Sequence, residues 1–249
     1  MTTTAVPKLG DILEGRVINI SEKCALISLH GHYVGKLRNK QITWLREKNA
    51  AAMQFIVGTY ITVIVHQVHH SKAMGNVLIE LGYRELLPNP WDLVESRFPI
   101  DSRVEGKIVE ILEFGAIVEL EYGYTGLLHN SELSWTDKNA KISQNFSIDE
   151  NISVLVKYSD SVQHRLLLSH RETQPDPIGE LSVSTQTTGK IIKVFQYGVL
   201  IELQNKCVAL LHHTKIPANF GGCVDDVLDI KIEAIDLSTR RIVASLLKT

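Results

Sequence analysis

The chain has 249 residues, of which 44% are hydrophobic, and its formal net charge at pH 7 is −2. This hydrophobic fraction is typical of folded chains and argues against disorder, and the missing basic excess excludes binding of nucleic acid by bulk charge alone. The three cysteines form no C-x-x-C pair, the first ten residues lack the apolar core of a signal peptide, and no apolar run approaches the roughly 18 residues of a membrane helix. We therefore expect a cytoplasmic protein without membrane contact.

The predicted elements form one series three times, because β-branched residues in alternation predict five strands in each series. The first series is expected at residues 12–20, 24–30, 33–38, 60–68 and 76–81. The second is expected at 103–112, 115–121, 124–129, 152–158 and 165–169, and the third at 187–195, 198–203, 207–212, 227–235 and 241–246. A partly helical connection should follow each third strand, and it is longest over 44–55, where helix-favouring residues are dense. This is the element order of an OB barrel.

Direct sequence repetition supports the three series. GRVINISEKCALISL begins at Gly15, GKIVEILEFGAIVEL at Gly106 and GKIIKVFQYGVLIEL at Gly189, and the register holds through the third strand. Self-similarity at a fixed spacing indicates repeated modules. The predicted fold class is all-β, with three tandem five-stranded OB-fold barrels joined by short linkers.

The repeats also predict the domain boundaries. We expect a first, divergent domain at residues 1–86, a linker at 87–98, a second domain at 99–173, a linker at 174–183 and a third domain at 184–249. The first linker is proline-rich, and its Trp91 and Phe98 are expected to pack on a neighbouring barrel. The second linker contains prolines without aromatics and is expected to be looser.

The middle repeat resembles a known family. The stretch VEGKIVEILEFGAIVELEYGYTGLLHNSELSWTDKN, from Val104 to Asn139, is similar to the S-one RNA-binding domain, the OB-fold unit of the largest bacterial small-subunit ribosomal protein. Similar units occur in polynucleotide phosphorylase and in endoribonucleases. The preceding NPWDLVESRFP resembles the linker between successive domains of the ribosomal protein, and the last repeat matches through AIDLSTRRIVASL. The first repeat matches by register alone.

The resemblance implies an RNA-binding face on each barrel. In the family, an aromatic on the second strand stacks on a base, a second aromatic follows three residues later, a histidine ends the third strand, and an Asp/Arg pair flanks the fifth. Stacking on an aromatic ring is worth about 1–3 kcal/mol per base, histidine reaches the 2′-hydroxyl, and lysine and arginine meet phosphate. In the middle repeat the RNA-binding positions are Lys107, Phe114, His129 and Arg165, with Asp160 orienting the arginine.

The last repeat offers a similar set and the first does not. The RNA-binding positions in the last repeat are Lys190, Tyr197, His212, Arg240 and Arg241, with Asp236 as the orienting residue. The second aromatic is replaced by Ile117 in the middle repeat and by Leu200 in the last. In the first repeat the corresponding residues are Lys23, Leu26, Arg38 and Asn76, which are cationic or polar without a stacking surface.

Structural readings compete with these functional ones. Phe114 and Tyr197 are alternatively core aromatics, although the glycine after each favours a bulge or a close backbone approach that directs the ring outward. The histidines are alternatively ordinary barrel-end residues, and Arg165 and Arg241 solvated charges. The adjacent His212 and His213 are expected to point to opposite faces of a strand.

No enzymatic or metal-binding motif is recognised. The sequence lacks a P-loop, a nucleophile elbow, a zinc-protease helix and a dinucleotide fingerprint. No cysteine or carboxylate joins His66, His69 and His70 at ligand spacing. We therefore predict no catalytic residue, no metal and no cofactor.

The predicted function is binding of single-stranded, mRNA-like RNA by the second and third domains through stacking and basic contacts. The resemblance places this in bacterial translation or mRNA handling, and the first domain is expected to dock the ribosome or a ribonuclease complex. The alternative is a protein-interaction scaffold or an adaptor subunit of an RNA-processing complex. Residues 91–175, with 8 Lys+Arg against 14 Asp+Glu, favour that alternative.

Overall fold

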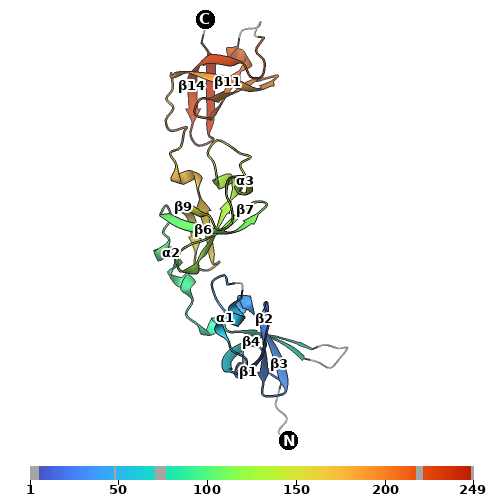
Figure 1. Ribbon diagram of the computed structural model, residues 1–249. Helices are drawn as coiled ribbons and strands as arrows, with labels where there is room; N and C mark the ends of the chain where they lie inside the picture. The colour runs from blue at the N-terminus through green and yellow to red at the C-terminus, as the bar shows by residue number, and fades with distance from the viewer. Residues whose placement is uncertain (1–5, 48, 71–76, 217–220, 248–249) are drawn as a thin grey trace. The chain divides into compact units, whose positions relative to one another are not determined.

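The computed structural model describes residues 6–47, 49–70, 77–216 and 221–247. Its strands form three closed barrels of five strands each, labelled in Figure 1. The first barrel contains β1 (Ile12–Ile20), β2 (Cys24–Leu29), β3 (Tyr33–Arg38), β4 (Tyr60–His70) and β5 (Val77–Gly82). The second contains β6 (Arg103–Leu112), β7 (Gly115–Glu119), β8 (Thr125–His129), β9 (Asn151–Asp160) and β10 (Arg165–Ser169). The third contains β11 (Gln186–Phe195), β12 (Gly198–Leu203), β13 (Val208–His212), β14 (Val227–Asp236) and β15 (Arg241–Leu246).

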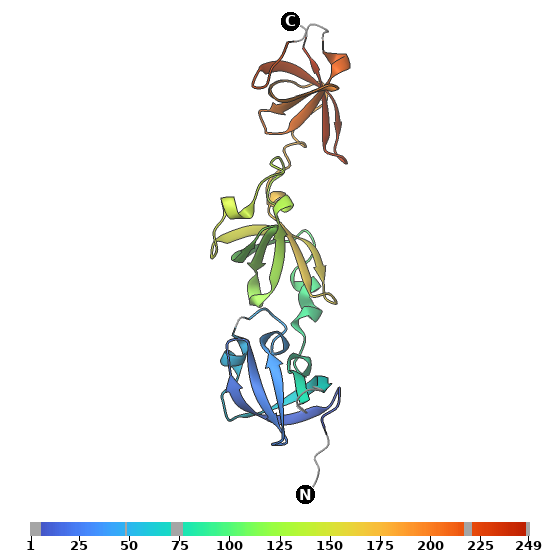
Figure 2. The same ribbon diagram turned by 90° about the vertical axis from the view of Figure 1, so that its right-hand side faces the viewer.

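The strand order is the same in all three barrels. The first three strands form an antiparallel meander, and the fifth strand lies between the third and the fourth. The third and fifth strands run parallel, as in the pairs Gly35 with Ile79 and Ala209 with Ile242. Figure 2 shows the closed barrels from a second side. The predicted all-β class, the three barrels and their strand positions are confirmed to within one or two residues.

The helices are short. They are α1 (Ala50–Gln54), α2 (Val94–Arg97) and α3 (Ile142–Asn145), and the 3₁₀ turns are η1 (Asn39–Gln41), η2 (Arg84–Leu86), η3 (Pro90–Leu93), η4 (Glu121–Gly123), η5 (Asn130–Glu132), η6 (Arg171–Thr173) and η7 (His213–Lys215). The helix expected over 44–55 is limited to α1, whose Ala50 and Ala51 are buried in the first core. None of the helices in the described part of the chain is long and apolar enough to cross a membrane.

The repeated glycine of the first strand makes room for the core. A Cβ on Gly15 would fall 2.4 Å from Cγ2 of Ile27, and one on Gly189 would fall 2.3 Å from Cγ2 of Ile201. Both isoleucines are fully buried. A side chain at the glycine would therefore displace a core residue of the facing strand, which explains why the glycine recurs in the three repeats.

The first linker is anchored by its aromatics. The rings of Trp91 and Phe98 contact the ring of Tyr124 at centroid distances of 5.4 and 5.2 Å, and Tyr124 directly precedes β8 of the middle barrel. The Tyr124 hydroxyl donates to the carbonyl of Pro90. The expectation that Trp91 and Phe98 pack on a neighbouring barrel is confirmed.

The second linker is also anchored, which corrects the expectation that it is looser. Ile178 is buried among the core residues of the last barrel, and the Asn205 side chain donates to the carbonyl of Pro177 at 2.9 Å. Asp176 forms an ion pair with Arg240. The second linker is thus attached to its barrel by a buried aliphatic residue and an ion pair, whereas the first linker is attached by two aromatic residues.

In each of the first two barrels, a tryptophan indole N–H donates a hydrogen bond to the first residue of the linker that follows the barrel. The indole Nε1 of Trp44 donates to the carbonyl of Leu87 at 3.4 Å, and that of Trp135 donates to Gln174 at 3.2 Å. An arginine guanidinium covers each indole, Arg84 at 4.8 Å and Arg171 at 4.7 Å from the ring centroid. Both distances lie within the range of cation–π contacts.

Candidate nucleic-acid interface

The aromatic residue before the second strand is exposed in both later barrels. Phe114 precedes β7 and is 52% exposed, and Tyr197 precedes β12 and is 51% exposed. A large apolar ring left this open is not a core residue. The structural alternative for these two aromatics is therefore excluded, and both rings offer a face to a ligand.

A glycine brings each aromatic close to the third strand. A Cβ on Gly115 would fall 2.3 Å from the carbonyl oxygen of Leu128 and 3.1 Å from Cα of His129. In the last barrel Gly198 pairs directly with His212, and its Cβ would fall 2.3 Å from the carbonyl oxygen of Leu211. Gly198 also has φ +151, which side chains rarely adopt. The glycines thus mark a close backbone approach, one of the two predicted possibilities.

The histidine at the end of the third strand caps the turn that follows it. The backbone N–H of Ser131 donates to Nδ1 of His129 at 3.1 Å, and that of Thr214 donates to Nδ1 of His212 at 3.4 Å. Because a backbone N–H can only donate, Nδ1 is the acceptor and the neutral ring carries its proton on Nε2. Each histidine therefore keeps one N–H donor available beside the exposed aromatic.

The two barrels arrange these rings differently. In the middle barrel the Phe114 and His129 rings stack with centroids 6.4 Å apart. In the last barrel Tyr197 stacks instead on Phe195, at 5.0 Å, and the His212 ring lies 4.2 Å from that of His213. The expectation that His212 and His213 point apart is wrong, because β13 ends at His212 and η7 begins at His213.

The aspartates hold the turn from which the arginine strand begins. The Asp160 carboxylate accepts from the Tyr158 hydroxyl and from two backbone N–H groups of the turn, and Arg165 opens the next strand. The hydrogen bond from Tyr158 is the main cause of a lowered pKa at Asp160. Asp160 therefore holds the turn that precedes Arg165.

Asp236 does the same in the last barrel. Its carboxylate accepts from the hydroxyl and backbone N–H of Ser238 and of Thr239, and these bonds, the Ser238 hydroxyl first, hold its pKa well below the usual value. Arg241 follows at the start of β15. Arg241 and Tyr197 line the same surface hollow, with Leu200 at its apolar side. The structure thus brings the expected arginine and aromatic of the last barrel together.

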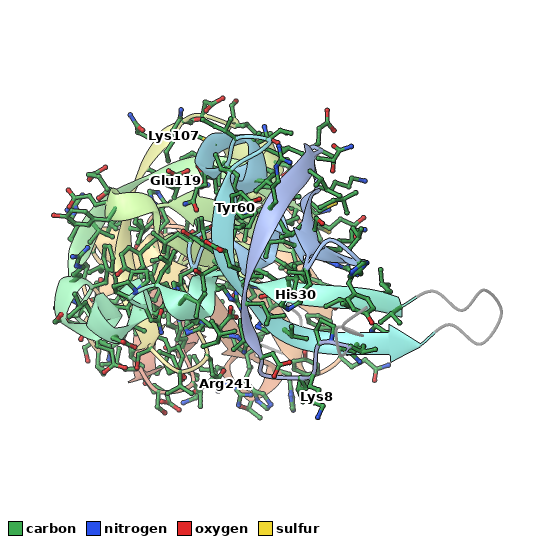
Figure 3. All side chains as sticks on the ribbon, turned by 90° about the horizontal axis from the view of Figure 1, so that it is seen from below. Lys8, His30, Tyr60, Lys107, Glu119 and Arg241 are labelled. Atoms are coloured by element: carbon green, nitrogen blue, oxygen red, sulfur yellow. The ribbon has the colours of Figure 1, made fainter. Side chains whose placement is uncertain are left out.

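Lys190 and Arg240 form ion pairs within the protein. The Nζ of Lys190 lies 2.6 Å from the carboxylate of Asp225, and this contact raises the lysine pKa. Arg240 forms two hydrogen bonds to Asp176 of the linker. Its guanidinium also lies 4.5 Å from the ring centroid of Trp135, so the side chain contacts both the linker and the indole that holds the linker. Lys107, labelled in Figure 3, lies on β6.

The first barrel lacks this arrangement. Lys23 stands where the later barrels have the aromatic, and Cys24 stands where they have the close-approach glycine. Arg38 replaces the histidine and forms an ion pair with Glu80 at 2.7 Å. Asn76 lies outside the described residues.

No group of three or more His, Cys, Asp or Glu side chains in the described ranges is placed to hold a metal ion. The residues that sequence reasoning missed are Lys193 and Phe195. These residues could have been found from the alternation K-x-F-x-Y, which ends at Tyr197. This alternation follows the first strand of the last barrel, whereas the second aromatic was expected on the second strand.

The model of the S1 RNA binding domain matches residues 97–171, which contain the five strands of the middle barrel. The chain is 30% identical over 224 residues to small ribosomal subunit protein bS1 of Rhodopseudomonas palustris, covering 88% of this chain and 38% of that protein. It is 30% identical over 217 residues to bS1 of Coxiella burnetii, covering 86% and 38%.

The predicted resemblance to the ribosomal S-one family is thereby confirmed. The chain spans about two fifths of the length of these relatives, 38% in both. Among solved structures, GSP13 from Bacillus subtilis is 29% identical over 34% of this chain and 65% of its own, with a TM-score of 0.29.

Proposed function

We propose that the chain binds single-stranded, mRNA-like RNA in translation, through the middle and last barrels. The observation that carries this proposal is the exposed aromatic beside a histidine N–H donor in both barrels. An unpaired base can stack on the ring, while the histidine N–H reaches a 2′-hydroxyl or a phosphate oxygen. The stretch matched by the S1 RNA binding domain includes Phe114, His129 and Arg165.

The proposed contacts are of two kinds. Phe114 and Tyr197 stack on bases, with His129 and His212 beside them. Lys107, Arg165, Lys190 and Arg241 meet the backbone, and Lys190 must exchange its Asp225 partner for phosphate. Two modest sites on one chain bind more tightly together than either alone, because the first contact raises the effective concentration at the second. Such an RNA site is compatible with the net charge of −2, because stacking on an aromatic ring does not require an excess of basic residues.

The first barrel is proposed to serve a protein or ribosomal partner. It has an exposed lysine, Lys23, in place of the stacking ring that Phe114 provides in the middle barrel. Its relatives of known name are ribosomal proteins, which supports a ribosome as that partner and the cytoplasm as the location. A ribonuclease complex is the second possibility.

The test is fluorescence anisotropy of the full chain with a short unstructured RNA at several salt concentrations. We expect binding that weakens with salt, with a log–log slope of about −0.7 per phosphate contact. Changing both Phe114 and Tyr197 to Ala should weaken binding at least tenfold, about 1.4 kcal/mol, with little change in slope, because stacking releases no counterions.

A matched control removes an exposed aromatic elsewhere. Tyr60, on β4 of the first barrel and labelled in Figure 3, is 65% exposed. Tyr60→Ala should leave RNA affinity unchanged. Full affinity in the Phe114→Ala, Tyr197→Ala chain would refute the site assignment. No binding by the unsubstituted chain at low salt would favour the scaffold alternative, to which the acidic stretch 91–175 points.

A further inference from the structure

Three side chains form a row at the end of the first strand of the last barrel. Lys193, Phe195 and Tyr197 alternate, and positions two apart on a strand share a face, so the row continues one face of β11 into the turn before β12. The Nζ of Lys193 lies 4.9 Å from the Phe195 ring centroid, within cation–π range. The Phe195 and Tyr197 rings stack at 5.0 Å with planes only 11° apart.

The middle barrel has no counterpart to this row. Glu110 and Leu112 occupy the equivalent positions, and the exposed Phe114 ring is supported by His129. The two barrels therefore support the same exposed ring by different means. Phe195 is less exposed than Tyr197, which is 51% exposed.

We infer that Phe195 is a positioning residue for RNA binding in the last barrel, and that Lys193 adds a phosphate contact at the same place. The inference rests on the proposed function and deepens it. A Tyr197 ring already held parallel to Phe195 loses less side-chain freedom when a base stacks on it. An aromatic pair of this geometry changes a binding constant by about threefold to tenfold. The last barrel is thus the stronger site for an unpaired base.

The test uses the full chain with Phe114→Ala, so that the last barrel dominates binding of a short oligouridylate. Phe195→Leu keeps an apolar side chain and removes the ring, and it should weaken binding by about threefold to tenfold. Phe195→Tyr restores the ring and should restore affinity. Val194→Ala is the control, because Val194 is exposed on the opposite face of β11, and it should change nothing.

A double-mutant cycle distinguishes positioning from a general effect on the fold. If Phe195 acts through Tyr197, Phe195→Leu should cost less than about twofold once Tyr197 is already Ala. Lys193→Gln should reduce the steepness of the salt dependence by about 0.7. The role of Phe195 would be overturned if Phe195→Leu left RNA affinity unaltered, or if it reduced affinity equally with and without Tyr197. The role of Lys193 would be overturned if Lys193→Gln left the salt dependence of RNA binding unaltered. Absence of RNA binding by the unsubstituted chain would instead overturn the proposed function itself.

Discussion

Phe114 and His129 come from neighbouring strands of the middle barrel, and their rings stack with planes 28° apart and centroids 6.4 Å from each other. The backbone explains this pairing. The Phe114 carbonyl accepts from the N–H of Asn130 at 2.9 Å, and Gly115 lies directly against the carbonyl of Leu128. The relation between the two rings is therefore set by main-chain contacts on both sides of them.

The first prediction follows from that contact. Gly115→Ala places a methyl group 2.3 Å from a backbone carbonyl that cannot rotate away. We expect a loss of about 3 kcal/mol in the free energy of unfolding, measured by urea denaturation, together with weaker RNA binding. Gly198→Ala should be at least as costly, because φ +151 adds backbone strain. Gly221→Ala is the control, since its Cβ meets no atom within 4 Å, and a comparable loss there would contradict the argument.

A second prediction separates the two roles of His129. His129→Asn keeps a side-chain acceptor for the N–H of Ser131 and removes the ring, while His129→Ala removes both. We expect Asn to preserve stability and Ala to cost about 1 kcal/mol in urea unfolding, the value of one hydrogen bond. Both should weaken RNA binding, by about tenfold if the lost hydrogen bond reaches a charged group. Equal stabilities of the Asn and Ala variants would show that the cap contributes nothing.

The third prediction concerns pH. The hydrogen bonds from Ser238 and Thr239 hold the Asp236 pKa below its usual value of 3.8. A group whose pKa is lower in the folded protein contributes stability above its unfolded pKa, and that contribution is lost as the pH falls toward the folded value. Asp236→Asn should therefore lower the unfolding temperature at pH 7, and the difference from the unsubstituted chain should shrink below about pH 4.

Asp229→Asn is the control for charge in the third prediction. It removes one exposed carboxylate from the same strand, β14, without touching the turn. We expect little change in the unfolding temperature. If both variants show the same pH profile, the effect comes from net charge and not from the turn bonds of Asp236.

The fourth prediction concerns the linker anchor. Trp135→Leu removes the hydrogen bond to the Gln174 carbonyl and the surface that Arg171 covers. Limited proteolysis should then cut the linker at 174–183 several times faster, because local opening controls cleavage. Trp135→Phe keeps a ring for the guanidinium and should give an intermediate rate. Unchanged cleavage in the Leu variant would rule out an anchoring role for Trp135.

The strands could be predicted from the sequence because alternation and the threefold repeat reinforce each other at every strand. Side-chain roles were harder to predict where a partner comes from a distant segment. The ion pair of Arg240 with Asp176, which lies 64 residues away in the linker, is a contact that sequence spacing does not reveal. The helix within 44–55 is shorter than its composition suggests and is confined to Ala50–Gln54.

The proximity of Phe114 to His129 could be predicted from the family pattern. The stacking of Phe195 on Tyr197 was missed, because here the chain departs from that pattern. Phe195 lies on the first strand, so a search three residues beyond Tyr197 found only Leu200. The contact of His212 with His213 was missed because strand alternation was applied to His213, which lies in η7 beyond the end of β13.

The close approach at Gly115 and Gly198 occurs in only two of the three barrels, so on the proposed function the number of barrels differs from the number of RNA-binding sites. The first barrel has Cys24 at this place and still closes with the same five-strand order. Closure of the barrel therefore does not require a glycine at this position. On the proposed function, the chain has more barrels than RNA sites, and an aromatic at Lys23 alone would not turn the first barrel into a third site.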